Sequence, residues 1–235
     1  MSASDEPAAV AAEPVVMPPI WPMYRALVGI GLLCGFLIVS AFALTKPIIA
    51  KNRAEALQAA IFEVLPAATS SASFDWQADG SFTEAVPGQA AEERLHAGYD
   101  GDGRLVGLAI EAHGMGYQDM VALLYGYSPE AQTIVGIKVL ESRETPGLGT
   151  RIETDPGFLA NFVALDVRLN AEGTGPLHTV EHVKPGKKTD PWQIDTISGA
   201  TISSVAVTDI LAASSAAWGP RIQPRKGDFV KGGAQ

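Results

Sequence analysis

A long uninterrupted apolar run dominates the first quarter of the chain. From Ala26 to Leu44 the sequence reads ALVGIGLLCGFLIVSAFAL without a charged residue. This length is close to the roughly 20 apolar residues that a helix needs to cross a bilayer core. Trp21 and Tyr24 precede the run, and Lys46 and Lys51 follow it, as is typical of interfacial anchors. The run exceeds the ~7–15 apolar residues of a signal peptide, so we expect an uncleaved membrane helix.

After this run the pattern changes to a helical one and then to short apolar stretches. Leu57, Ile61 and Leu65 recur at a spacing of four, and Pro66 ends the pattern, which predicts a juxtamembrane helix. A polar Ser/Ala/Gly stretch from about Ala67 to Glu93 reads as a connection. We therefore divide the chain into a disordered tail (1–23), a transmembrane helix (24–45), a juxtamembrane helix (46–66), a folded domain (67–219) and a flexible C-terminal tail (220–235).

The folded domain combines strand patterns with two helical ones. The runs RLVGLAIEAHG, MVALLYGYS and TIVGIKVLES, between Leu95 and Leu140, are rich in Val, Ile and Tyr and separated by turn residues. They predict strands joined by turns. Helical patterns follow at about Asp155–Ala164 and about Thr201–Trp218. The predicted fold class is α+β, with one N-terminal transmembrane helix before the domain.

Composition and charge narrow the functional classes. The formal net charge is -9 and no Lys/Arg stripe occurs, so a nucleic-acid partner is not expected. Cys34 is the single cysteine, so the chain cannot build an internal disulfide or a zinc or iron–sulfur site based on cysteine.

The most informative segment is Asp195-Thr196-Ile197-Ser198-Gly199-Ala200-Thr201, directly before the second helical pattern. Its small residues allow close approach to Thr201, which falls at a helix N-terminus, where free N–H groups and the helix dipole favour a phosphate. From physics alone, a plain helix N-cap is the favoured explanation of the same residues. A second segment, Glu144-Thr145-Pro146-Gly147-Leu148-Gly149, contains a Pro-Gly turn and a glycine suited to close backbone approach.

Together these segments resemble a known family. The string D-x-x-S-G-A-T resembles the flavinylation motif of the FMN-binding domain found in the G subunit of the Rnf electron transport complex and in the C subunit of the Na⁺-translocating NADH:quinone reductase. ETPGLG resembles the loop that lies against the flavin in the same family. The two motifs occur in the right order, about fifty residues apart, and the resemblance covers roughly residues 24–218.

The resemblance implies a site and a cofactor. Thr201 would carry FMN through a phosphoester bond made by a separate flavin transferase, with Ser198, Gly199 and Ala200 as the recognition motif. Glu144, Thr145, Leu148 and Gly149 would line the flavin pocket, and Tyr117 is a further candidate. Asp195 is expected to serve the transferase reaction or the local turn. No catalytic residue and no metal site is assigned.

The resemblance also implies a cellular setting. The chain would be a flavoprotein subunit of a membrane-bound, ion-translocating ferredoxin:NAD oxidoreductase, an electron-transfer part rather than a complete enzyme. Its partners would be other Rnf subunits, the transferase and the lipid bilayer. The family implies a periplasmic domain on the bacterial inner membrane, whereas Lys46, Lys51 and Arg53 after the helix, against Arg25 before it, favour a cytoplasmic one. We follow the family here.

Three alternatives stay open. The nearest is the C subunit of the quinone reductase, and the second is a membrane-anchored binding or assembly module without flavin. The third is a zinc peptidase, because His178-Thr179-Val180-Glu181-His182 matches the inverted zincin pattern H-x-x-E-H. That pattern needs a helix, and Pro176 and Pro185-Gly186 leave barely two turns, so solvated or hydrogen-bonded histidines are favoured.

Overall fold

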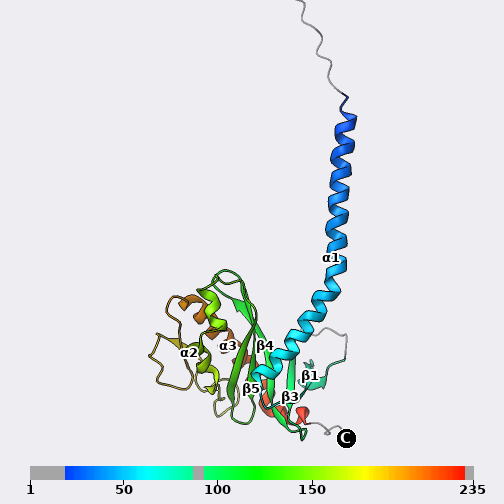
Figure 1. Ribbon diagram of the computed structural model, residues 1–235. Helices are drawn as coiled ribbons and strands as arrows, with labels where there is room; N and C mark the ends of the chain where they lie inside the picture. Colours follow the sequence, from blue (N-terminus) through cyan, green and yellow to red (C-terminus); the bar gives the residue numbers. More distant parts are fainter. Residues whose placement is uncertain (1–18, 87–92, 231–235) are drawn as a thin grey trace, which may run out of the picture. The chain divides into compact units, whose positions relative to one another are not determined.

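The computed structural model describes residues 19–86 and 93–230. The chain forms two compact units, residues 1–52 and 53–235, and each is described here by itself (Figure 1). The predicted N-terminal tail lies mostly outside the described residues, as do the last five residues of the predicted C-terminal tail.

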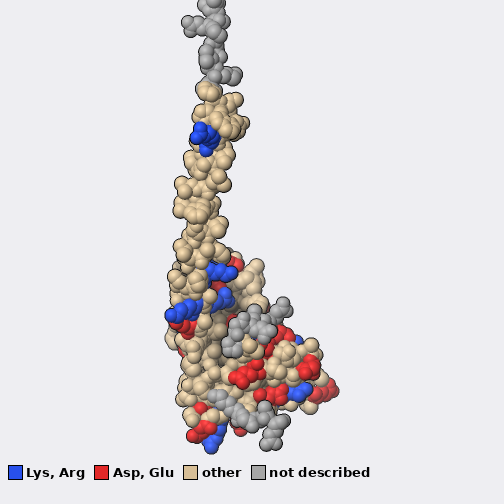
Figure 2. Space-filling model, turned by 90° about the vertical axis from the view of Figure 1, so that its right-hand side faces the viewer, with Lys and Arg blue, Asp and Glu red and all other residues tan. Residues whose placement is uncertain are grey.

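The first unit is the exposed part of a long helix, α1 (Trp21–Val64). Among the residues that the structure describes, α1 is the one helix that is long and apolar enough to cross a membrane. Figure 2 shows mostly uncharged surface along this part of the helix, apart from a basic patch near its upper end. The sequence predicts a membrane helix and a separate juxtamembrane helix. The structure joins them in one helix, which continues through Pro47 although proline removes one backbone donor.

The second unit is built on an antiparallel sheet with the strand order β2-β1-β3-β4-β5-β6-β7 (Figure 1). Hairpin connections join β3 to β4, β4 to β5 and β5 to β6, as expected for strands separated by short turns. A two-stranded parallel pair, β8-β9, lies outside this sheet. The strands are β1 (Ser70–Trp76), β2 (Phe82–Glu84), β3 (Arg94–Tyr99), β4 (Leu105–Met115), β5 (Met120–Ser128), β6 (Thr133–Glu141), β7 (Leu165–Asp166), β8 (Glu181–Val183) and β9 (Gln193–Asp195).

A helix covers each face of this sheet. On one face, strand residues such as Leu95 and Leu108 form the main core with α3 (Thr201–Ile222), including Val207 and Leu211. On the other face, Ala60, Ile61, Val64 and Leu65, at the end of α1, pack with Ala109 and Leu124. The end of α1 comes so close that a Cβ on Gly98 or Gly107 would lie 2.8 Å from a Leu65 methyl. Glycine in these two strands therefore permits the contact.

The predicted helix over Asp155–Ala164 is wrong in detail. The structure has a single turn, α2 (Pro156–Leu159), followed by a 3-10 turn, η2 (Ala160–Phe162). Asp155 caps α2 by accepting a hydrogen bond from the Phe158 N–H, and Pro156 occupies the first helical position. The Asn161 amide donates to the Phe158 carbonyl at 2.9 Å, which favours a turn over a longer helix.

The predicted connection and the predicted flexible tail both contain regular structure among the residues described. The polar stretch before Glu93 contains β1 and β2. The predicted flexible tail from Pro220 is wrong for the residues described, because α3 continues to Ile222 and a 3-10 segment, η3 (Gln223–Phe229), follows. Phe229 is fully buried, and its carbonyl accepts a hydrogen bond from the Tyr99 hydroxyl at 2.8 Å. The single buried ring of Phe229 anchors this segment, and a single buried residue leaves almost no periodic signal in the sequence.

Candidate functional site

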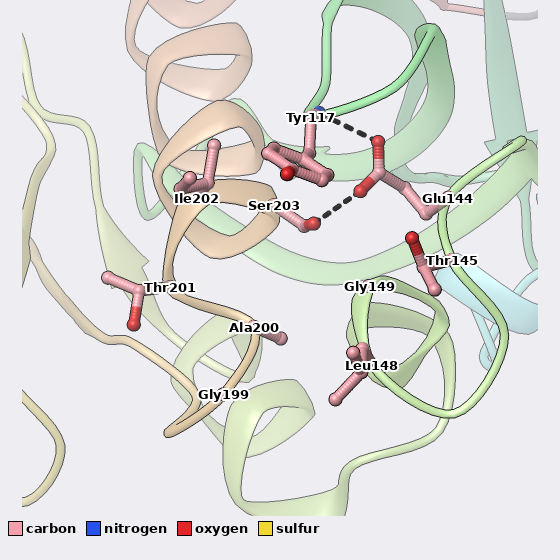
Figure 3. A pocket seen from close by; sticks show the side chains of 10 residues that line it. All are labelled: Tyr117, Glu144, Thr145, Leu148, Gly149, Gly199, Ala200, Thr201, Ile202 and Ser203. Carbon is pink, nitrogen blue, oxygen red and sulfur yellow. Dashed lines mark hydrogen bonds between the residues drawn. The ribbon is translucent and has the colours of Figure 1, made fainter.

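The two informative segments of the sequence meet at the N-terminal end of α3. There they form an open pocket of about 360 Å³ (Figure 3). The loop after β6 provides one wall, the segment before α3 provides the floor, and the turn between β4 and β5 provides a third side. Ten residues line the pocket: Tyr117, Glu144, Thr145, Leu148, Gly149, Gly199, Ala200, Thr201, Ile202 and Ser203.

A tight turn delivers the chain into α3. The Ala200 N–H donates to the Ile197 carbonyl at 3.0 Å, and Gly199 takes a φ of +84° at the third position of the turn. A positive φ at this position is characteristic of a type II turn and favours glycine. The Ser204 hydroxyl fixes the junction by accepting from the Ile197 N–H at 3.1 Å and donating to the Ala200 carbonyl at 2.9 Å. The SGAT sequence is therefore the turn that starts the helix.

Thr201 is the first residue of α3 and is exposed. In Figure 3 its side chain lies at the edge of the pocket away from Glu144. Its hydroxyl makes one weak hydrogen bond, to the Ile197 carbonyl at 3.4 Å. The Ser204 N–H makes the first intrahelical bond, to the Ala200 carbonyl. The N–H groups of the first turn, starting at Thr201, precede that bond and have no intrahelical acceptor, so they can bind an anion.

A buried carboxylate holds three sides of the pocket together. Glu144 is 4% exposed. Its Oε1 accepts hydrogen bonds from the backbone N–H groups of Tyr117 at 2.7 Å and Gln118 at 3.1 Å. Its Oε2 accepts from the Ser203 hydroxyl at 2.5 Å (Figure 3). One side chain thus joins the β4–β5 turn, the loop after β6 and the first turn of α3.

Two glycines make room for this carboxylate. A Cβ on Gly116 would lie 2.5 Å from Glu144 Oε1, and a Cβ on Gly149 would lie 2.5 Å from Oε2. Contacts this short do not occur without movement of the backbone or of the carboxylate. The final glycine of ETPGLG is therefore required by the buried acid at the start of the same motif.

The side chains of Arg151 and Asn161 also hold the segment before α3 in place. Arg151 donates to the Ser198 carbonyl at 2.8 Å and to the Asp155 carboxylate at 2.6 Å. The Arg151 hydrogen bond is the main reason why the pKa of Asp155 lies below its usual value. The Asn161 side chain accepts from the Asp195 N–H at 3.1 Å and donates to the Asp195 carbonyl at 3.3 Å. Residues that follow ETPGLG therefore position the SGAT segment.

Asp195 stabilises a neighbouring turn with its side chain. Its Oδ1 accepts hydrogen bonds from the backbone N–H groups of Lys187 at 2.9 Å and Lys188 at 3.0 Å. This geometry fits the local-turn role among the two roles expected from the sequence.

The pocket opening is apolar. Leu148, Ile202 and Tyr117 are 52%, 58% and 61% exposed, although side chains of this kind are usually covered. In Figure 3 they surround the space in front of Ser203 and Glu144. A flat aromatic ligand would cover these side chains and gain their apolar contact area.

The structure brings most of the sequence-predicted residues to this pocket. Seven of the eight line it, and Ser198 does not; Ser198 instead contributes its carbonyl to Arg151. Tyr117 also lines it. Sequence reasoning missed Ile202, Ser203 and Arg151. Their positions beside the two motifs were the available signal, but their roles depend on contacts between segments distant in the sequence.

The H-x-x-E-H segment does not form the helix that its zinc-binding interpretation requires. Glu181 and His182 lie in strand β8, and Glu181 accepts a hydrogen bond from the Gln193 amide at 2.9 Å. His178 stacks on Trp192, with 3.8 Å between ring centroids. Glu181 and His178 therefore have partners within the protein, and the segment lacks the helical geometry of a zinc-binding H-x-x-E-H motif.

Comparison with known proteins defines the class of this domain. Residues 116–215 match the model of the FMN-binding domain family. This segment is less than half of the chain but contains the whole pocket, and the match confirms the resemblance seen in the two motifs.

Two curated relatives are similar to part of the chain. The chain is 40% identical over 116 residues to the G subunit of the ion-translocating oxidoreductase complex of Methanosarcina acetivorans, covering 49% of this chain and 53% of that protein. It is 34% identical over 95 residues to the protein of the same name from Pasteurella multocida, covering 40% of this chain and 42% of that one. The chain thus spans about half the length of the curated relatives it matches.

A solved structure shares the fold. It is the C subunit of a Na⁺-translocating NADH-quinone reductase from Parabacteroides distasonis, with a TM-score of 0.51 and 23% sequence identity over 66% of this chain and 78% of that one. At this identity the likeness concerns the fold alone.

Proposed function

We propose that this chain is the flavoprotein subunit of a membrane-bound, ion-translocating ferredoxin:NAD oxidoreductase complex of the Rnf type. In this proposal it relays electrons through an FMN joined by a phosphoester to Thr201. The observation that carries the proposal is the position of Thr201, at the first residue of α3 and at the edge of the pocket of an FMN-binding domain.

The residues of the pocket fit the parts of FMN. The N–H groups of the first turn of α3 suit a phosphate. Gly199 and Ala200 add little side-chain bulk between Thr201 and the pocket interior. Leu148, Ile202 and Tyr117 offer apolar area to a ring system. The flavin supplies the redox chemistry, and the protein supplies its position and its electrostatic surroundings.

The surroundings of Thr201 also explain why attachment needs another enzyme. A threonine hydroxyl is a weak nucleophile without a base, and the hydrogen-bond partner of this hydroxyl is a backbone carbonyl. A flavin transferase would provide the base, and its substrate FAD would provide the leaving group. The Thr201 Oγ1–phosphorus bond would form and the bond between the two phosphates of FAD would break. AMP would leave, and the transferase base would take the proton of the Thr201 hydroxyl.

Helix α1 would anchor the protein in the inner membrane, with the flavin domain on the periplasmic side, among the other Rnf subunits. A covalent flavin on an anchored domain cannot dissociate and stays at high effective concentration near its electron partners. The chain is then one redox step of a translocase, without a complete reaction of its own.

In-gel flavin fluorescence after denaturing electrophoresis tests the attachment. The full chain is coexpressed with a flavin transferase as wild type, Thr201→Val, Thr201→Ser and Thr174→Val. We expect a fluorescent band for wild type and for Thr174→Val, whose threonine lies outside the pocket. Thr201→Val keeps the side-chain shape but removes the nucleophilic oxygen, so its band should be dark.

The other outcomes have distinct meanings. Fluorescence in Thr201→Val would place the bond on another residue. A dark wild type, with the transferase active on a control protein, would favour the flavin-free binding or assembly module. Signal in Thr201→Ser would show that the hydroxyl, rather than the threonine methyl, is what the reaction needs.

Two further measurements test the complex and the topology. Purification of the tagged chain from native membranes, with mass spectrometry of its partners, separates an Rnf complex from a quinone reductase. For topology, Cys34 is replaced by Ser and a new cysteine is placed at exposed Glu172. Labelling of Glu172→Cys by a membrane-impermeant maleimide, when only the outer membrane is permeabilised, would support a periplasmic domain. Labelling only after lysis would contradict it.

A further inference from the structure

The pocket contains one strong source of charge. Among its ten described lining residues, Glu144 is the one carboxylate, and none of the ten is Lys, Arg or His. The basic residues nearest in the sequence have other partners. Arg143 bonds Asp119 at 3.1 Å, and Arg151 bonds Asp155 and the Ser198 carbonyl. No basic side chain of the described lining therefore offsets the Glu144 charge inside the pocket.

The hydrogen bonds of Glu144 are those of an ionised acid. Two backbone N–H groups and the Ser203 hydroxyl donate to it. An ionised carboxylate accepts hydrogen bonds only, and this matches the three donors aimed at the two oxygens of Glu144. With 4% of the residue exposed, water contributes little to screening this charge.

These contacts separate Glu144 from an ordinary ligand-binding group. Oε1 already accepts two hydrogen bonds and Oε2 accepts a short one, so both oxygens are occupied by the protein. Glu144 therefore acts on a neighbouring ligand through its charge and through the segments that it positions. It is a positioning and electrostatic residue.

We propose that the buried Glu144 carboxylate lowers the reduction potential of the flavin held in this pocket. Each electron accepted by a flavin ring adds a negative charge unless a proton follows it. A fixed negative charge on a buried carboxylate beside the ring opposes that addition, so the oxidised flavin is favoured. This inference rests on the proposed function, because it needs a flavin bound in the pocket.

The test compares reduction potentials of the flavinylated full chain in detergent, measured by spectroelectrochemical titration. Glu144→Gln removes the charge and keeps an oxygen that can accept from the Tyr117 and Gln118 N–H groups. We expect its potential to be more positive than that of wild type by about 59 mV, which is a tenfold change in a one-electron equilibrium constant. Glu153→Gln makes the same change in net charge at an exposed site and should leave the potential unchanged.

The inference requires that removal of the Glu144 charge raise the flavin potential. It fails if flavinylated Glu144→Gln has the potential of wild type or a more negative one. If Glu144→Gln does not fold or take up flavin, Ser203→Ala decides, because it keeps the carboxylate and removes a donor that offsets its charge. A more negative potential in Ser203→Ala supports the inference, and an unchanged or more positive potential overturns it. A wild type without flavin would instead count against the proposed function.

Discussion

The two ends of α3 are held in different ways. At its start, the Ser203 hydroxyl donates to Glu144 and the Ser204 hydroxyl accepts from the Ile197 N–H, while apolar side chains such as Leu148 remain exposed. At its far end, roughly 33 Å away for a 22-residue helix, aromatic rings close over one another. Phe229 packs on Phe82 with 4.8 Å between ring centroids.

This difference follows from what each end has to do. An end that must admit a ligand cannot fill its opening with its own side chains, so buried polar contacts behind the pocket fix its shape. The far end has no such requirement and gains stability from aromatic burial. Stability and cofactor binding should therefore respond to different substitutions in the two regions.

Phe229→Ala should produce the largest loss of stability. It removes a fully buried ring from contact with Phe74 and Phe82. We expect the free energy of unfolding to fall by about 3–5 kcal/mol. The measurement is denaturant unfolding, with Val230→Ala, at an exposed neighbour, as the control.

The same Phe229 variant should still accept flavin wherever it is folded. The covalent flavin per folded molecule, from absorbance of the purified monomeric fraction, should match wild type. A selective loss of flavin from well-folded Phe229→Ala would show that the two ends of α3 are coupled.

Gly149→Ala should have the converse profile. The added Cβ would lie 2.5 Å from Glu144 Oε2 and 2.7 Å from the Glu144 Cβ, so the loop or the acid must move. We expect a cost of about 1–3 kcal/mol and a clear loss of covalent flavin. Gly175→Ala is the matched control, because a Cβ there meets nothing within 4 Å. Normal flavin content in Gly149→Ala would contradict the packing argument.

Tyr99→Phe tests the far end through a single hydrogen bond. Losing the donor to the Phe229 carbonyl should cost about 1 kcal/mol at neutral pH. Burial raises the pKa of Tyr99 from 10.0 to about 12. Since the folded state then holds the proton more tightly, this stabilisation is complete below pH 10 and is lost as the pH rises through about 12.

The pH profile gives the Tyr99 prediction a second readout. Phenylalanine does not ionise, so Tyr99→Phe should lose less stability than wild type between pH 10 and about 12. Parallel losses in the two proteins would mean that other groups, such as the buried Tyr125, control the alkaline transition.

The sequence predicted the parts of the molecule that depend on local pattern. The apolar helix, the central strands, α3 and the positions of the two motifs each leave a periodic or compositional signal. Other contacts leave no such signal, because they join segments that only tertiary folding brings together. Examples are the contacts of Glu144 with the 117–118 backbone and with Ser203. The buried Phe229 was missed for the same reason: one anchor has no period. The roles of Thr201 and its neighbours toward FMN remain predictions.

Arg151→Gln should give the smallest change in stability and a distinct effect on the site. The Arg151–Asp155 pair is partly exposed, with 40% and 23% of the two side chains accessible, so its loss should cost less than about 1 kcal/mol. Arg151 also holds the Ser198 carbonyl, three residues before Thr201. We expect flavin attachment by the transferase to slow by about tenfold, since small displacements of a reacting group are costly.

A time course of in-gel fluorescence measures the Arg151 effect, with Arg168→Gln as the control. Arg168 pairs with the buried carboxylate of Asp166 outside the pocket, so its loss should leave the rate per folded molecule unchanged. Arg151→Lys should be intermediate, because lysine keeps the charge but lacks the planar fork that reaches Asp155 and Ser198 together. Equal rates for wild type and Arg151→Gln would mean that the turn at Gly199 and the Ser204 contacts are sufficient to position Thr201. The polar support of this end of α3 would then lie within the SGAT segment and the first turn of α3, without help from the residues after ETPGLG.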